Sequence, residues 1–98
     1  MFAYIWEYII RGDKREDFLR YYEPEGVWAA FFQKGEGYIR TELLEDAENP
    51  QRFLTIDYWR SKADRDAFRK KHAQEFEKID KTCESFPRSE RFWGDFNC

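Results

Sequence analysis

The chain has 98 residues, the usual length of one domain, and we expect a single domain over residues 1–98. Its 17 Lys and Arg against 20 Asp and Glu give a net charge of −3, with the two signs interleaved. This balance lacks the clustered basic excess that nucleic-acid binding needs, and no apolar run is long enough to cross a membrane. Because 20% of the residues are Phe, Tyr or Trp, the composition also excludes a disordered chain.

The first residues lack the basic region of a signal peptide, so we expect no such leader. The two cysteines, Cys83 and Cys98, match no zinc or redox spacing. We therefore expect two free thiols in a cytoplasmic protein.

The first predicted strand covers residues 2–10, where both alternating faces are largely apolar. A strand of this kind is covered on both sides, so we place it in the centre of a sheet. After a turn at 11–13, Asp13 with Glu16 three residues later predicts a capping box that starts a helix. Pro24 interrupts this helix, and a second helical segment over 27–32 ends at the glycines of 35–37.

Residues 38–45 and 52–59 are two further predicted strands, and the Asn49–Pro50 turn signal between them indicates an antiparallel hairpin. Ser61 predicts the start of one long helix that runs to about Thr82. Spacings of three and four predict one inward stripe along this helix, made by Phe68, His72, Phe76, Ile79 and Cys83. Pro87 follows the helix, and a last short strand is predicted over 90–94.

The predicted order is βαββαβ, an α+β, ferredoxin-like arrangement with one antiparallel sheet and both helices on one face. The first strand is apolar on both faces, so the sequence does not say which face meets the helices. The other face needs a cover, and a second copy of the sheet predicts an isologous homodimer. The alternative is a C-terminal tail folded over that face, but about five residues after Trp93 are too few at ~3.3 Å each.

No Walker loop, GxSxG, HExxH or GxGxxG motif is present. His72 is the only histidine and lies on the predicted stripe of the long helix. It is a candidate proton shuttle or axial haem ligand, and the alternative is a packed, hydrogen-bonded core histidine. One histidine excludes a multi-histidine metal site within a subunit, and we predict no metal site.

Two carboxylates, Glu7 and Asp57, interrupt the apolar faces of predicted strands. Because the first and third strands of this fold are neighbours, the two carboxylates are candidates for a close pair with one raised pKa. The alternative is that each pairs with an arginine, such as Arg40, Arg52 or Arg60.

Several aromatic residues are candidates to line a pocket between sheet and helices. Such a pocket would suit a flat, hydroxylated ligand, and the alternative is plain core packing. The candidates are Trp6, Tyr8, Trp28, Tyr38, Tyr58, Trp59 and Trp93.

A longer pattern begins with Leu54-Thr55-Ile56-Asp57 and continues with Trp59-Arg60-Ser61 into a helix that carries Phe68 and His72. With the opening strand, the Asp17-Phe18 helix and the segment 90–96, it resembles the antibiotic biosynthesis monooxygenase-like family. That family belongs to the dimeric α/β-barrel superfamily. The resemblance implies a ferredoxin-like protomer, a homodimer formed by sheet-to-sheet packing and a pocket between sheet and helices.

Some members of this family oxidise polycyclic phenols with molecular oxygen and without metal or flavin. The resemblance thus implies a cofactor-independent monooxygenase that acts on a small aromatic, phenol- or quinol-type substrate. On this hypothesis the candidate catalytic residues are His72, Trp59 and Asp57. The candidate substrate-binding residues are Trp6, Tyr8, Trp28, Tyr38 and Phe68.

Two other functions stay open. One is a non-catalytic dimeric module that binds a small aromatic ligand. The other is haem binding or degradation, because some relatives degrade haem with an asparagine on the first strand and a tryptophan and a histidine on the long helix. Here Trp6, Phe68 and a lysine near Lys78 take those positions, so haem through His72 is a minor alternative.

Overall fold

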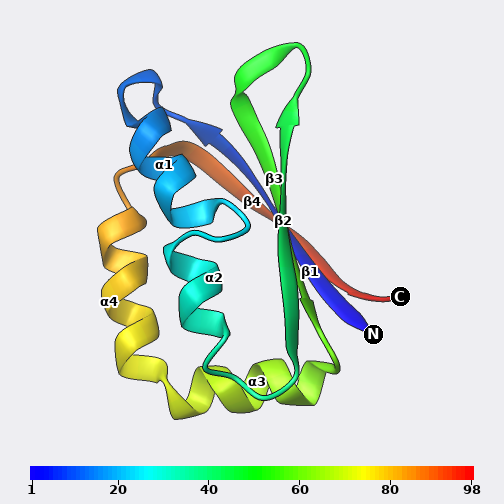
Figure 1. The fold of residues 1–98 in the computed structure, drawn as a ribbon. Coiled ribbons are helices and arrows are strands. Elements are labelled where there is room, and N and C mark those ends of the chain that lie inside the picture. The colour runs from blue at the N-terminus through cyan, green and yellow to red at the C-terminus, as the bar shows by residue number, and fades with distance from the viewer.

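The computed structural model describes all 98 residues, and its centre is one antiparallel sheet of four strands in the order β2-β3-β1-β4 (Figure 1). The strands are β1 (Phe2–Ile10), β2 (Tyr38–Asp46), β3 (Asn49–Trp59) and β4 (Pro87–Asn97). The helices lie on one face and are α1 (Arg15–Tyr22), α2 (Val27–Phe32), α3 (Lys62–Lys71) and α4 (Ala73–Cys83). This confirms the predicted α+β, ferredoxin-like βαββαβ order.

The prediction that β1 is central is also confirmed. It pairs with β3 on one side and β4 on the other, both antiparallel. Register places Tyr4 opposite Asp57 and Tyr8 opposite Phe53. The tyrosine face of β1 meets the helices, because the ring of Tyr8 lies 5.5 Å from that of Phe18 on α1.

The start of the first helix differs from the prediction. Asp13 lies in a short 3-10 turn (Gly12–Lys14), and α1 begins at Arg15 with no side-chain cap. The predicted capping box of Asp13 and Glu16 is therefore wrong, because the 3-10 turn takes the place of the capped first turn. The break at Pro24 is confirmed, since α1 ends at Tyr22 and α2 begins at Val27.

The long helix predicted from Ser61 to Thr82 is two helices. Its start is confirmed, because the backbone N–H of Asp64 donates to the Ser61 hydroxyl at 3.1 Å. His72 leaves helical geometry with φ −112° and ψ 30°, and there the chain changes direction from α3 to α4 (Figure 1). Hydrogen bonds from His72 N–H to Phe68 and from Phe76 N–H to His72 keep the i to i−4 spacing. Since the spacing survives, the sequence pattern alone does not reveal the bend.

The last strand is longer than predicted and forms an edge of the sheet. Its residues 87–97 pair with β1, and the backbone N–H of Cys98 donates to the carbonyl of Met1. The C-terminal segment therefore extends the sheet and does not cover its second face.

Aromatic side chains fill the space between the sheet and the helices. The largest fully buried ones are Trp59, Phe18 and Phe53. Gly35 lies so close to this core that an added Cβ would meet Phe68 at 2.6 Å and Trp59 at 2.8 Å. Gly35 thus does more than end a helix, because it lets the chain pass directly over Trp59.

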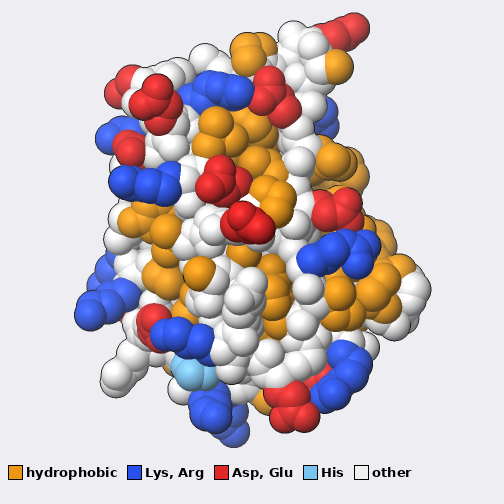
Figure 2. Space-filling view, in the orientation of Figure 1, with side chains coloured by type: hydrophobic (Ala, Val, Ile, Leu, Met, Phe, Trp, Pro, Cys, Tyr) orange, Lys and Arg blue, Asp and Glu red, His pale blue; other side chains and the backbone are white.

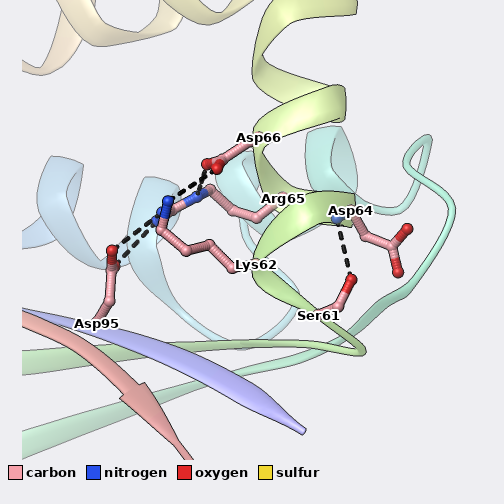
Figure 3. Close-up of polar contacts among 6 residues, drawn as sticks. All are labelled: Ser61, Lys62, Asp64, Arg65, Asp66 and Asp95. Carbon is pink, nitrogen blue, oxygen red and sulfur yellow. Dashed lines mark hydrogen bonds and ion pairs between the residues drawn. The ribbon is translucent and has the colours of Figure 1, made fainter.

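A partly buried ion pair joins α3 to β4 (Figure 3). Arg65 donates from both terminal nitrogens to Asp95, each at 3.2 Å, and from Nε to Asp66 at 2.7 Å. Its side chain is only 5% exposed and its guanidinium lies about 5 Å from the ring centres of Phe2 and Tyr4. Arg65 therefore fastens the edge strand to the helical layer.

The face of the sheet away from the helices, here called the outer face, is uncovered. Large hydrophobic side chains on it are exposed, among them Leu44, Trp93 and Phe96.

No helix of the structure is long and apolar enough to cross a membrane. On the face shown in Figure 2, basic and acidic side chains alternate with hydrophobic ones, as the interleaved charges of the sequence predict.

Candidate active site

A cavity of about 330 Å³ lies between the inner face of the sheet and the helices. All four strands and all four helices contribute to its wall. Seven of its 13 lining residues are hydrophobic, which gives a mainly aromatic wall with a few polar groups. The lining residues are Tyr4, Trp6, Tyr8, Tyr22, Trp28, Phe32, Thr41, Thr55, Asp57, Arg69, Phe76, Asp80 and Glu90.

Asp57 is the buried carboxyl group of this wall, and only 7% of the residue is exposed. The Thr41 hydroxyl donates to Asp57 Oδ1 at 2.6 Å, and the Tyr38 hydroxyl lies 2.6 Å from Thr41 Oγ1. Because Thr41 gives its proton to Asp57, Tyr38 is the donor to Thr41. Burial raises the pKa of Asp57 to about 6, although hydrogen bonds from Thr41 and Tyr4 and the charge of Arg69 oppose the rise.

Arg69 is the one cationic side chain of the wall. Its guanidinium lies 5.0 Å from the ring centre of Tyr4 and 5.4 Å from that of Phe76. Its Nε is buried and has no hydrogen-bond partner in the protein. Burial raises the pKa of the Tyr4 hydroxyl well above its usual value, so this phenol stays neutral. Asp57, Tyr4 and Arg69 together give one end of the cavity an acid/base group, a neutral donor and a positive charge.

Asp80 on α4 and Glu90 on β4 also line the cavity. Burial raises both pKa values, and the neighbouring negative charge of Asp80 adds to the rise at Glu90. The aromatic residues Tyr22, Trp28 and Phe76 line the same cavity, with the rings of Trp28 and Phe76 5.1 Å apart. The indole N–H of Trp28 is buried without a hydrogen-bond partner.

The structure brings together about half of the site residues predicted from the sequence. Asp57, Trp6, Tyr8 and Trp28 line the cavity. Tyr38 lies behind the wall, joined to it through Thr41. Tyr58 and Trp93, the two other pocket candidates, belong to the outer face, where Tyr58 lies opposite Ala3 and Trp93 donates to Glu7 at 2.9 Å.

Trp59, Phe68 and His72 are not among the lining residues. Trp59 is fully buried in the core, and Phe68 packs against it with ring centres 5.3 Å apart. His72 lies at the bend between α3 and α4, partly exposed, with its ring 4.7 Å from that of Phe68 and 6.0 Å from that of Phe31. Its place at the edge of the core agrees with the alternative of a packed histidine.

The predicted close pair of Glu7 and Asp57 is wrong, although β1 and β3 are neighbours as expected. Tyr4 is the residue opposite Asp57, and Glu7 is opposite Leu54. Three positions separate Glu7 from Tyr4, and because successive side chains alternate, Glu7 points to the outer face. For Glu7 the alternative of an arginine partner is confirmed, since Arg52 donates to it at 3.2 Å. For Asp57 that alternative is wrong, because its hydrogen-bond partner is Thr41.

The sequence reasoning missed several wall residues. Thr41 and Thr55 are buried polar residues on the inner face, and the two-residue spacing between Thr55 and the predicted Asp57 was the signal that could have found Thr55. Phe76 belongs to the predicted stripe, whereas Arg69 and Asp80 lie beside it, each one position after a stripe residue. Charged residues at such helix positions are typical of solvent-exposed surface, so the sequence did not indicate that Arg69 and Asp80 line the cavity.

His72, the predicted haem ligand, could not bind a haem iron in this cavity. The only imidazole of the chain is outside the wall, and no three His, Cys, Asp or Glu side chains are grouped to hold a metal ion. The proposed function therefore does not involve haem.

Comparison with solved structures shows the same fold in several proteins. SnoaB, a cofactor-independent oxygenase from Streptomyces nogalater, is 23% identical over 99% of this chain and 91% of its own, with a TM-score of 0.71. PA3566 from Pseudomonas aeruginosa is 14% identical over 99% and 92%, with a TM-score of 0.70. A conserved protein from Methanosarcina mazei is 13% identical over 98% and 90%, with a TM-score of 0.71. At these identities the similarity establishes a shared fold.

Sequence comparison gives the family. No curated protein sequence matches the chain significantly. A family model described as antibiotic biosynthesis monooxygenase matches residues 1–79, which is most of the chain. The chain therefore belongs to the antibiotic biosynthesis monooxygenase family.

Proposed function

We propose that this protein is a cofactor-independent monooxygenase that acts on a small aromatic substrate of the phenol or quinol type. The observation that carries the proposal is a buried carboxyl group with a pKa of about 6 that shares an aromatic-walled cavity with a guanidinium. Family membership supports the reaction class, and SnoaB is described as a cofactor-independent oxygenase.

The reaction needs no electron donor beyond the substrate. A phenol gives four electrons to O₂ and loses two hydrogens, one from the hydroxyl group and one from the ring carbon that is oxygenated. One oxygen atom forms a C–O bond to the ring, which becomes a quinone, and the other leaves as water. The protein has to bind the ring, remove the phenolic proton and stabilise the resulting anion, because the phenolate gives up electrons more readily than the phenol.

Three groups of the cavity have these roles. Asp57 accepts the phenolic proton, and its pKa of about 6 leaves it ionised at neutral pH while making it a stronger base than an ordinary aspartate. The Arg69 guanidinium, whose Nε has no partner in the protein, stabilises the phenolate oxygen. The aromatic rings of Trp6, Tyr8 and Phe76 orient the substrate and exclude water.

Oxygen uptake tests the proposal. A panel of phenols, naphthols and quinols is incubated with the protein in an oxygen electrode, with quinone formation followed by absorbance. We expect uptake of one O₂ per quinone, a loss of at least a hundredfold in kcat for Asp57→Asn, and a pH profile that rises through about pH 6.

The conservative variant Thr55→Ser keeps a hydroxyl on the wall and serves as the matched control. Binding of a phenol without oxygen uptake under any condition would refute the monooxygenase proposal and favour the non-catalytic binding module. Equal kcat in Asp57→Asn and the wild type would remove Asp57 from the reaction.

We further propose that residues 1–98 act as one domain and that two copies pair through their outer faces. The support is the uncovered face itself, with Leu44 and Phe96 each more than 40% exposed. Large exposed hydrophobic side chains on one uncovered sheet face are typical of an interface with another chain. Light scattering is expected to give twice the protomer mass, and Leu44→Glu is expected to give the protomer alone. A protomer mass for the wild type at working concentration would overturn the dimer.

A further inference from the structure

The charges on the cavity wall do not balance. Three carboxyl groups line it, from Asp57, Asp80 and Glu90, against one guanidinium, that of Arg69. None of the three carboxyl groups makes an ion pair with a side chain of the protein, although many other acidic residues do. Because these negative charges have no cationic partner in the protein, the cavity favours a ligand that carries a positive charge.

Two of these carboxyl groups act as a pair. Asp80 comes from α4 and Glu90 from β4, so they approach the cavity from the helical layer and from the sheet. The charge of Asp80 raises the pKa of Glu90, and the charge of Glu90 in turn raises that of Tyr8. Asp80 and Glu90 are both exposed residues at the open side of the cavity, and the effect of Asp80 on Glu90 shows two negative charges that repel one another there. A cation placed between them would relieve that repulsion.

The surroundings of this pair are aromatic. Tyr8, Tyr22, Trp28 and Phe76 line the same cavity, with ring centres 5.1 Å apart for Tyr8 and Tyr22. Faces of aromatic rings attract ammonium groups, and they do so more strongly when water is excluded. Trp28 is a separate sign that the cavity holds a polar ligand, because it is only 7% exposed and its indole N–H, which can only donate, has no acceptor in the protein. This N–H calls for an acceptor atom on the ligand, whereas its ring face is available to the ammonium group.

From this arrangement we propose that the substrate is a phenol that carries a protonated amine. The ammonium group lies between Asp80 and Glu90 against the rings of Tyr22 and Phe76, and the phenol oxygen lies toward Asp57 and Arg69. The orientation of the phenol rests on the proposed function, but the ammonium site does not. One end of the cavity thus binds the ammonium group of the substrate, and the other end binds its phenol oxygen.

The same charges also discriminate against other aromatic molecules. A carboxylated phenol would place a negative charge beside Asp80 and Glu90, which is repelled. A neutral alkylphenol gains the aromatic contacts but not the charge interaction. The expected order of affinity is therefore cation, then neutral molecule, then anion.

Three ligands of nearly equal shape test this order on the whole wild-type chain by calorimetry at low salt. They are tyramine, 4-propylphenol and 3-(4-hydroxyphenyl)propionate, which differ mainly in the charge of the side-chain end. We expect tyramine to bind at least tenfold more tightly than 4-propylphenol and the propionate to bind most weakly. Equal affinities, the reverse order, or no binding of tyramine would each overturn the proposal.

Variants then locate the effect. In Asp80→Asn with Glu90→Gln, the preference for tyramine over 4-propylphenol is expected to fall to less than threefold while 4-propylphenol binds as before. The control is Glu25→Gln, which removes a charge from an exposed residue outside the wall and should keep the preference. A preference that survives in the double variant would also overturn the proposal, and the wild-type series decides the matter if that variant does not fold.

The result is separable from the proposed reaction. Tyramine that binds with the expected preference but consumes no oxygen would leave the ammonium site in place and refute the monooxygenase. Oxidation of neutral phenols with no preference for tyramine would support the monooxygenase and overturn the ammonium site.

Discussion

Replacing Asp57 by Asn is expected to stabilise the fold, and to do so more strongly as the pH rises. The native carboxyl group has a pKa of about 6 because it is buried, against an ordinary value of 3.8 in the unfolded chain. Between these values the native state holds a proton that the unfolded state has released. The free energy of unfolding therefore falls as the pH rises from about 4 to about 6.

The magnitude follows from the pKa. Each unit is worth about 1.4 kcal/mol. The rise to about 6 therefore lowers the free energy of unfolding by about 3 kcal/mol at pH 8 relative to a group that does not ionise. Asparagine has nearly the same shape, its carbonyl can accept the hydrogen bond from Thr41, and it carries no charge. The variant should gain less than about 1 kcal/mol at pH 4 and about 3 kcal/mol at pH 8.

Urea unfolding followed by tryptophan fluorescence measures this difference at pH 4, 5, 6, 7 and 8. The other carboxyl groups titrate in both proteins, so the difference between variant and wild type isolates Asp57. Asp13→Asn, at an exposed position without an ion pair, is the matched control and should change stability by less than about 0.5 kcal/mol. A difference that is constant over this pH range, or that shrinks as the pH rises, would refute the reasoning. Asp57, whose ionised carboxyl group destabilises the native state, is the base of the proposed reaction.

Three more predictions concern stability and reactivity. Asp95→Asn weakens the partly buried pair with Arg65 and should lower the free energy of unfolding in urea by about 2 kcal/mol, so an unchanged unfolding midpoint would contradict it. Phe18→Ala removes a fully buried ring and should cost about 3–5 kcal/mol by the same measurement, so a loss below 1 kcal/mol would mean that the core refills the space. Burial raises the pKa of the Cys83 thiol to about 11, so Ellman's reagent at pH 8 should label Cys98 alone in the native protein and both thiols in urea; rapid native labelling of Cys83 would show that its surroundings open.

Local patterns in the sequence determined the elements and their order. Two apolar faces on residues 2–10 predicted a central strand, and proline at 24 divided the first helical region. The Ser61 side chain forms the predicted cap, because capping depends on residues three apart in the chain. From these elements the ferredoxin-like order followed, since short connections leave few ways to arrange them.

Tertiary structure decided which side chains meet. Period-two alternation shows which residues of one strand share a face, but the register between strands decides that Asp57 is opposite Tyr4 and that Glu7 is on the other side. The bend at His72 keeps the helical spacing, so sequence periodicity could not separate α3 from α4. Only the packing of α3 and α4 over the sheet, with β4 at its edge, brings Arg69, Asp80 and Glu90 to one wall, because these three residues come from three different elements.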